Sequence, residues 1–437
     1  MSQIDYLVKP GGQLNGEFRV PGDKSISHRS IMFGAIADGT TRVTGFLQGE
    51  DSLNTLKAFR AMGVEIDGPD ANGEVTIHGV GIDGLKQPSG VIDLGNSGTS
   101  IRLMSGLLSG QAFDVVLSGD RSLSKRPMKR VTEPLALMGA KVDTEEGGKP
   151  PLRIHGGSDI NGIDYQLPMA SAQVKSCLLL AGMYAQGKTC VTEPAITRDH
   201  TERMLNAFGY KVETEGNRMC LQGGGRLTAC NIDVPADISS AAFFMVGASI
   251  AEKADITLQH VGVNPTRTGI IDILKLMGAN IELFNERTVG GEPVADIRVK
   301  SSPLKGINVP ENLVPLAIDE FPVLFVAAAC AVGKTVVTGA EELRVKESDR
   351  IQVMAEGLQA IGVDCEATPD GMIISGGSIQ GGKVHSRDDH RIAMAFTMAA
   401  LRAESDIIIE DCENVNTSFP DFVGLANKAG ISVSIAK

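Results

Sequence analysis

At 437 residues, the chain exceeds what one compact hydrophobic core usually serves, so two or three domains are expected. A formal net charge of −12 and a 4% aromatic content argue against nucleic acid as the main partner, because such binding needs a positive surface or stacking rings. No basic-then-apolar secretory signal opens the chain, and the longest apolar stretches, 241–251 and 321–333, are too short to span a bilayer, so the sequence favours a cytoplasmic protein without a membrane partner.

In chain order, the first periodic feature is a helical pattern that ends in glycine and leads into a short strand, and it recurs six times. The glycines are Gly63, Gly139, Gly209, Gly278, Gly362 and Gly430. A glycine just past a helix supplies the left-handed conformation that closes it. The spacing of the six copies indicates a repeated unit of about 70 residues.

A second, more apolar helix is expected in each unit. The six segments carry Ser, Asn or Asp, which cap helices, at or next to their first residue, and continue as small apolar residues: 24–39, 96–110, 171–187, 237–253, 319–333 and 388–404. Because they are apolar almost all round, we expect them to be buried. Alternating strands and helices predict an α/β (α+β) fold with three units in each of two domains.

Cations gather at the polar starts and loops of these units, although the chain is acidic. Examples are Lys24 and Arg29, Arg102, Lys125 and Arg126, Arg198 and Arg203, Lys346 and Arg350, and Arg387 and Arg391. Helix starts also expose N–H groups that attract anions. The pattern predicts small, multiply anionic ligands; for any single arginine, a surface ion pair is the alternative.

Carboxylates lie among these cations. Asp319 and Glu320 open one buried helix, and Glu347 lies between Lys346 and Arg350. Carboxylates in such surroundings can accept protons, which suits general-base catalysis, while capping or ion pairing is the alternative role. His28 and His390 lack the partners of a nucleophilic triad, so we expect them to orient their neighbours.

Two features of the sequence argue against nucleotide binding and against a metal site. Residues 182–189, GMYAQGKT, match a nucleotide-binding loop, but here an apolar helix precedes and a strand follows, which is the reverse of the required order. Seven scattered cysteines without a CxxC pair, and seven histidines without ligand spacing, predict free buried thiols and no metal.

Eight motifs together closely resemble the 5-enolpyruvylshikimate-3-phosphate synthase family. One of them, TRDHTER, and a further motif, SLSKRP, resemble its bacterial class II branch more than class I. The motifs are PGDKSISHR, LGNSGTSIR, LPMASAQVKS, TRDHTER, AIDEFP, RVKESDR, DDHRIAMA and TSFPDF, and the match runs in order from about Lys9 to Phe422. The resemblance implies a two-domain inside-out α/β barrel of six βαβαββ-type units. It places residues 22–236 in one domain, residues 1–21 plus 237–437 in the other, and the active site in the cleft between them.

The resemblance also assigns site residues. For shikimate 3-phosphate it implies Lys24, Ser25, Arg29, Ser171, Ala172, Gln173, Arg198, Asp319 and Lys346. For phosphoenolpyruvate it implies Lys24, Asn96, Gly98, Thr99, Arg126, Gln173, Arg350 and Arg391. Asp319, Glu347 and Lys24 are the candidates for proton transfer, and neither a metal nor an organic cofactor is implied.

The implied reaction is an addition followed by an elimination, with release of phosphate. Because Gly98 leaves room beside phosphoenolpyruvate, we expect inhibition by glyphosate. Thr417 stands where some relatives carry a lysine, so one pocket cation is missing. We expect a monomer.

Two rivals remain at this point. UDP-N-acetylglucosamine enolpyruvyl transferase shares the fold, but the family usually needs a cysteine in the loop that corresponds to residues 118–127, and none occurs there. A non-catalytic anion binder would have no need of the acid–base groups.

Overall fold

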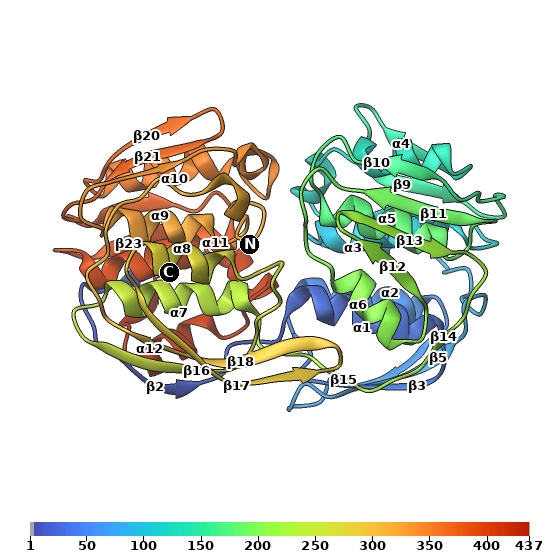
Figure 1. Cartoon of the computed structure of the whole chain (residues 1–437), viewed down its shortest axis with the longest axis horizontal. Helices are drawn as coiled ribbons and strands as arrows, with labels where there is room; N and C mark the ends of the chain where they lie inside the picture. Colours follow the sequence, from blue (N-terminus) through green and yellow to red (C-terminus); the bar gives the residue numbers. More distant parts are fainter. Residues whose placement is uncertain (1–3, 437) are drawn as a thin grey trace. The chain divides into compact units, whose positions relative to one another are not determined.

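A computed structural model describes residues 4–436, and the chain divides into two compact units (Figure 1). Unit 1 comprises the chain up to Pro21, residues 235–288 and the chain from Glu292 onward. Unit 2 comprises residues 22–234 and 289–291. Each unit has helices at its centre and strands at its periphery, so the mixed α/β class expected from the sequence is confirmed.

Unit 2 repeats one pattern three times: a buried helix, then a sheet, then a helix nearer the surface. The buried helices are α1 (Lys24–Ile36), α3 (Gly98–Ser109) and α5 (Ala172–Gly182). The outer helices are α2 (Glu50–Ala61), α4 (Lys129–Leu137) and α6 (His200–Ala207).

Each repeat of unit 2 contributes one sheet. The first has the order β14-β3-β5-β4, with β15 also on β3: β3 (Ala37–Thr44), β4 (Glu65–Asp67), β5 (Val75–Val80), β14 (Leu227–Thr228) and β15 (Ile232–Asp233). The second has the order β6-β7-β9-β8: β6 (Ile92–Asp93), β7 (Val115–Ser118), β8 (Lys141–Glu145) and β9 (Lys149–His155). The third has the order β10-β11-β13-β12: β10 (Asp164–Gln166), β11 (Lys188–Thr192), β12 (Val212–Glu215) and β13 (Arg218–Gln222). Because β14 and β15 leave the third repeat and pair with β3, the last repeat is joined to the first.

Unit 1 follows the same plan. Its buried helices, which pack on one another, are α7 (Ile238–Ile250), α9 (Phe321–Ala329) and α11 (His390–Ala399). Its outer helices are α8 (Gly269–Leu276), α10 (Arg350–Ala360) and α12 (Phe422–Ala429).

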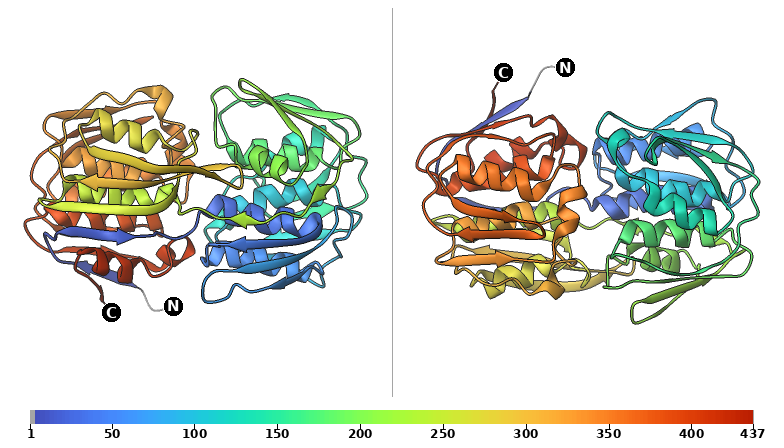
Figure 2. Two further views of the ribbon diagram at one scale, coloured as in Figure 1. Left: turned by 60° about the horizontal axis from the view of Figure 1, so that its bottom comes forward. Right: turned by 90° about the horizontal axis from the view of Figure 1, so that it is seen from above.

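The N-terminal segment completes two sheets of unit 1. One sheet has the order β22-β23-β1-β24: β1 (Asp5–Val8), β22 (Gly382–His385), β23 (Ile407–Glu410) and β24 (Val433–Ala436). Another has the order β17-β18-β16-β2: β2 (Leu14–Phe18), β16 (Ala254–Gly262), β17 (Asn280–Val289) and β18 (Glu292–Lys300). The left view of Figure 2 shows the dark blue β2 beside the yellow-green β16. The third sheet has the order β19-β21-β20: β19 (Lys334–Val337), β20 (Asp364–Thr368) and β21 (Gly371–Ser375).

The six glycines expected to end helices do so. All six adopt a positive φ between 78° and 109°, one or two residues after the last residue of α2, α4, α6, α8, α10 or α12. At these angles a side chain would strain the backbone, so the residue type fixes where each outer helix stops.

The buried helices begin where polar caps were expected. Five of them are capped by a side chain that accepts a hydrogen bond from a backbone N–H in the first turn: Asp23, Ser97, Ser171, Asp237 and Asp389. The sixth, α9, has no such bond from Glu320 and begins with a proline near its first position, where the missing N–H costs nothing.

Close helix packing explains one glycine that no turn requires. A Cβ on Gly106 of α3 would lie 2.0 Å from the carbonyl oxygen of Cys177 in α5, so only glycine lets the two helices approach this closely. The contact brings α3 directly against α5.

Residues 182–189 lie in the order predicted for a turn and not for a nucleotide-binding loop, since α5 ends at Gly182 and β11 begins at Lys188. The expectation of seven free thiols is wrong for one pair. Cys190 and Cys220 stand directly opposite each other on β11 and β13, with Cα atoms 4.1 Å apart, and form a disulfide. Sequence spacing gave no sign of this pairing because it arises from strand register.

None of the helices in the described part of the chain has the length and apolar character needed to cross a membrane. Within residues 4–436, no group of three or more His, Cys, Asp and Glu side chains is arranged to hold a metal ion.

Candidate active site

The start of α1 carries three of the predicted residues. Lys24 forms an ion pair with Asp51, which lies in the first turn of α2. Ser25 is partly exposed, and its carbonyl oxygen accepts a hydrogen bond from Arg29 at 3.0 Å. Arg29 is buried, and its other nitrogens donate to Thr201 at 2.7 Å and to Ser176 at 3.0 Å. The guanidinium is therefore fixed by three elements of unit 2.

The starts of α3 and α5 are joined through Gln173. Its side-chain oxygen accepts a hydrogen bond from Arg102 at 2.6 Å, and its nitrogen donates to Thr99 at 3.1 Å. Ser171 caps α5, and Ala172 is the first residue of that helix. The glutamine is thus oriented by two groups of α3, one of which, Arg102, was noted in the sequence as a cation but not assigned to the site.

Arg126 follows a short 3-10 turn and faces the start of α3. It donates to Asn96 at 2.6 Å, and Asn96 is held in turn by Asp120 at 2.8 Å. A Cβ on Gly98 would lie 2.9 Å from a terminal nitrogen of Arg126 and equally close to one of Arg102. The absence of a side chain at residue 98 therefore leaves both guanidinium groups in place.

His28 lies inside unit 2, behind these helix starts. Its Nδ1 is 2.8 Å from the hydroxyl of Thr55 and 3.2 Å from that of Ser100. Burial, with Lys24 and Arg29 nearby, lowers the pKa of His28 well below its usual value. The imidazole therefore stays neutral and links α1, α2 and α3, which agrees with the orienting role expected from the sequence.

In unit 1, Arg350 is the centre of a second cluster. Its guanidinium is 1% exposed and contacts three carboxylates, Asp389 at 2.8 Å, Asp319 at 3.1 Å and Glu347 at 2.6 Å. Burial acts to lower the pKa of Arg350, but the three carboxylates outweigh it and raise the pKa further. The two predicted acid–base carboxylates are thus held on one buried cation.

Asp319 has further cations around it. The Nζ of Lys346 lies 3.6 Å from one carboxylate oxygen, and Arg391 lies 3.9 Å from the other. Arg391 also donates to the carbonyl oxygen of Asp319 at 3.0 Å, and Lys346 donates to Glu342 at 2.8 Å. The starts of α9, α10 and α11 therefore converge on Asp319.

Sequence reasoning selected most members of both clusters and missed their partners. Asp51, Asp389, Glu342 and the buried Lys175–Glu193–Glu202 group were not assigned a role. Arg198 lies in the loop between β11 and α6, and Thr417 is buried with its hydroxyl donating to Asn414 at 2.7 Å. Sequence reasoning could have found Asp51 and Asp389 by one feature, because both lie at the polar starts of helices.

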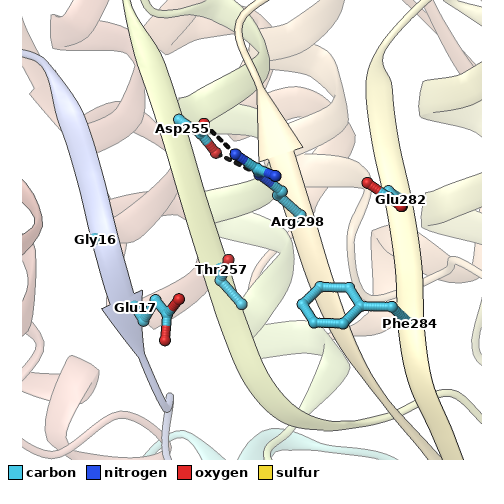
Figure 3. A pocket seen from close by; sticks show the side chains of 7 residues that line it. All are labelled: Gly16, Glu17, Asp255, Thr257, Glu282, Phe284 and Arg298. Carbon is cyan, nitrogen blue, oxygen red and sulfur yellow. Dashed lines mark hydrogen bonds and ion pairs between the residues drawn. The ribbon is translucent and has the colours of Figure 1, made fainter.

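A groove of about 500 Å³ lies elsewhere, on the outer face of the β17-β18-β16-β2 sheet (Figure 3). Glu17, Asp255 and Glu282 give it an acidic lining, and Phe284 forms one wall. Arg298 donates to both oxygens of Asp255, at 2.8 and 2.7 Å, and so already supplies a cation there. None of the predicted site residues lines this groove.

The repeated fold and the two clusters at its helix starts define an enzyme that handles small anionic substrates. A family model described as EPSP synthase (3-phosphoshikimate 1-carboxyvinyltransferase) matches residues 8–425. Proteins named 3-phosphoshikimate 1-carboxyvinyltransferase from Alkalilimnicola ehrlichii and Hydrogenovibrio crunogenus are each 67% identical, with 99% of this chain covered and 97% and 99% of theirs. A solved EPSP synthase from Acinetobacter baumannii is 62% identical, with both chains fully covered and a TM-score of 0.90.

The chain belongs to the EPSP synthase family. It is an enzyme that transfers an enolpyruvyl group, in the shikimate pathway of aromatic amino acid biosynthesis. The family, the fold class and the activity expected from the sequence are thereby confirmed.

Proposed function

We propose that the two clusters supply the groups that bind shikimate 3-phosphate and phosphoenolpyruvate. In unit 2, the residues that bind shikimate 3-phosphate are Lys24, Ser25, Arg29, Ser171, Ala172, Gln173 and Arg198. The phosphoenolpyruvate side is formed by Lys24, Asn96, Gly98, Thr99, Arg126 and Gln173. In unit 1, Asp319 and Lys346 bind the ring hydroxyls, while Arg350 and Arg391 bind phosphoenolpyruvate. The family match over residues 8–425, in a chain whose cations gather at helix starts, carries this proposal.

We assign the two roles to the two domains whose boundaries were expected from the sequence. Residues 22–236 form the shikimate 3-phosphate side, and residues 1–21 plus 237–437 form the second domain, with the reaction in the cleft between them. Closing the two on their ligands would gather cations around the anions and exclude water, which strengthens each electrostatic contact.

The proposed reaction has two steps. In the addition, the 5-hydroxyl attacks C2 of phosphoenolpyruvate, Asp319 takes the hydroxyl proton, and C3 gains a proton through Glu347. In the elimination, C3 returns a proton to Glu347, the C2–O bond to phosphate breaks, and Lys24 assists the departing phosphate. The hydroxyl proton held by Asp319 leaves with the products, so both carboxylates regain their starting state. The products are the enol ether, 5-enolpyruvylshikimate 3-phosphate, and phosphate.

Ion pairing supports the choice of Asp319 and Glu347. Both carboxylates contact Arg350, and Lys346 lies near Asp319. An incoming anion would compete for these cations, so the carboxylates would lose part of their pairing when substrate arrives. A carboxylate that is released from its cation when substrate binds can accept a proton only when the substrates are present.

Three finer proposals accompany this assignment. Glyphosate inhibits the enzyme, because Gly98 has no side chain that would displace the guanidinium groups of Arg102 and Arg126. The enzyme acts as a monomer and resides in the cytoplasm, where it needs no cofactor because cationic side chains can stabilise the developing charges. Sedimentation of the purified protein at the mass of one chain, 46.0 kDa, would be the expected result for a monomer.

A coupled phosphate-release assay tests the whole proposal. Release should require both shikimate 3-phosphate and phosphoenolpyruvate, should fail with unphosphorylated shikimate at equal concentration, and should fall as glyphosate competes with phosphoenolpyruvate. Turnover with UDP-N-acetylglucosamine in place of shikimate 3-phosphate would instead favour the rival enolpyruvyl transferase.

A further inference from the structure

Lys175 is a charged side chain buried inside unit 2, in the turn of α5 that follows Gln173. Its side chain is 1% exposed. The Nζ donates to Glu193 at 2.9 Å and to the carbonyl oxygen of Thr197 at 3.5 Å, and it forms an ion pair with Glu202 at 2.8 Å. One ammonium group therefore contacts two points of the segment that joins β11 to α6, and a third point in the first turn of α6.

Glu193 folds this segment into a closed loop. One oxygen of its carboxylate accepts the backbone N–H of Thr197 at 3.3 Å, and the other accepts the hydroxyl of Thr197. The backbone N–H of Glu193 donates to Asn217 at 2.9 Å, which fixes the other end of the loop. Because Arg198 directly follows Thr197, its backbone is set by this loop.

Glu202 extends the same cluster into α6. It lies in the first turn of that helix, and its neighbour Thr201 accepts the hydrogen bond from Arg29. Glu202 is buried, and its second carboxylate oxygen has no hydrogen-bond partner. Burial raises the pKa of Glu202, whereas for Lys175 the two carboxylates outweigh burial and the pKa is also raised.

A buried group of one cation and two carboxylates is a costly way to hold a loop, because charges lose their hydration when buried. An apolar cluster of similar volume would stabilise the fold at least as well. The three side chains converge on the loop that carries Arg198, and Lys175 itself belongs to the first turns of α5, whose start carries Ser171 and Gln173. Ser171, Gln173 and Arg198 are the residues proposed above to bind shikimate 3-phosphate. The directional contacts of the charged groups fix the conformation of that loop more precisely than an apolar cluster would.

We propose that Lys175, with Glu193 and Glu202, is a positioning group that fixes Arg198 for the phosphate of shikimate 3-phosphate. This inference rests on the proposed role of Arg198. Lys175 does not touch the substrate; it acts through the loop and the start of α6, and the affinity for shikimate 3-phosphate depends on it.

The test is a double-mutant cycle with Lys175→Met and Arg198→Ala, read out as the KM of each substrate. Lys175→Met should raise the KM for shikimate 3-phosphate about tenfold or more, since misplacing a binding group by about 1 Å can cost about a hundredfold. The KM for phosphoenolpyruvate should change by less than about threefold. In the Arg198→Ala background the same substitution should have almost no further effect on KM, because the group it positions is gone.

Three companion variants separate a positioning role from loss of folding. Lys175→Arg keeps the charge and should restore part of the affinity. Leu180→Ala, a buried change farther along α5, should lower the melting temperature without changing either KM. If Lys175→Met does not fold, Glu202→Gln carries the cycle, with a smaller rise in the KM for shikimate 3-phosphate that is also lost in the Arg198→Ala background.

Two results would overturn the inference and can be told apart from failure of the proposed function. The positioning role alone is refuted if Lys175→Met leaves the KM for shikimate 3-phosphate unchanged while Arg198→Ala raises it. It is also refuted if Lys175→Met raises this KM equally in the unsubstituted protein and in the Arg198→Ala background. An unchanged KM in Arg198→Ala removes the assignment of Arg198 itself.

Discussion

Replacing Gly98 with alanine places one methyl group between two fixed guanidinium groups. The added Cβ would lie 2.9 Å from the nearest nitrogen of Arg102 and of Arg126. Ordinary contact begins at 3.4 Å, so each group must move by 3.4 − 2.9, or about 0.5 Å. Neither can swing away freely, because Arg102 is tied to Gln173 and Arg126 to Asn96, both at 2.6 Å.

The size of the effect follows from the bonds that this shift disturbs. A hydrogen bond to a charged group contributes about 1.5–3 kcal/mol, and a displacement of this size should forfeit about 1–2 kcal/mol of the binding of an anion by Arg126. That corresponds to a rise of about 5- to 30-fold in the KM for phosphoenolpyruvate. Folding should not suffer, because alanine is the better helix former by about 1 kcal/mol at the first turn of α3.

The assay is steady-state phosphate release with each substrate varied in turn, with and without glyphosate. We expect the inhibition constant of glyphosate to rise together with the KM for phosphoenolpyruvate, and the KM for shikimate 3-phosphate to stay within about twofold. Gly90→Ala is the matched control, since a Cβ at Gly90 has no neighbour within 4 Å and φ is not positive. An unchanged KM for phosphoenolpyruvate, or an equal rise for both substrates, would refute the reasoning.

Three other expectations can be checked separately. Asp319→Asn should bind both substrates and turn over about a hundredfold more slowly or worse in single-turnover experiments; binding with native turnover would remove Asp319 from proton transfer. The pKa of His28 is lowered from 6.5, so its stabilising contribution is present above that pH and is lost as the pH falls. Urea unfolding at pH 7.5 and at pH 5.5 measures this. Between the two pH values, the free energy of unfolding should fall by about 1.4 kcal/mol more in the unsubstituted protein than in His28→Gln. An equal fall in the two proteins would contradict the prediction. Titration of the air-oxidised protein in denaturant should find thiols at the five unpaired cysteines before reduction and at all seven afterwards, whereas seven at the outset would refute the Cys190–Cys220 pair.

The repeated architecture could be predicted because its signals are local. A glycine that must adopt a positive φ after each outer helix, as at Gly63 or Gly430, is a property of one residue and its backbone. The same holds for the caps at Asp23 and Ser97, where a side chain bonds the helix it precedes. Such features repeat at a fixed period and are visible without any tertiary contact.

The partners within each site could not be predicted, because they come from other elements. Asp51 reaches Lys24 from the next helix, and Asp389 reaches Arg350 from 39 residues away. The Cys190–Cys220 pair depends on the register of two strands. Sequence reasoning selects residue types at helix starts, while the pairing is decided by how the helices and strands pack.

These pairings explain how a chain with a net charge of −12 can serve two anionic substrates. The cations proposed for the site do not form an unbalanced positive field, since Lys24, Lys346 and Arg350 each have a carboxylate at close range. Neutralised cations leave the helix starts stable without ligand, because like charges would otherwise repel at close range. We therefore expect each arriving phosphate or carboxylate to displace a carboxylate from its cation, so that binding of the anions and release of the bases are one event.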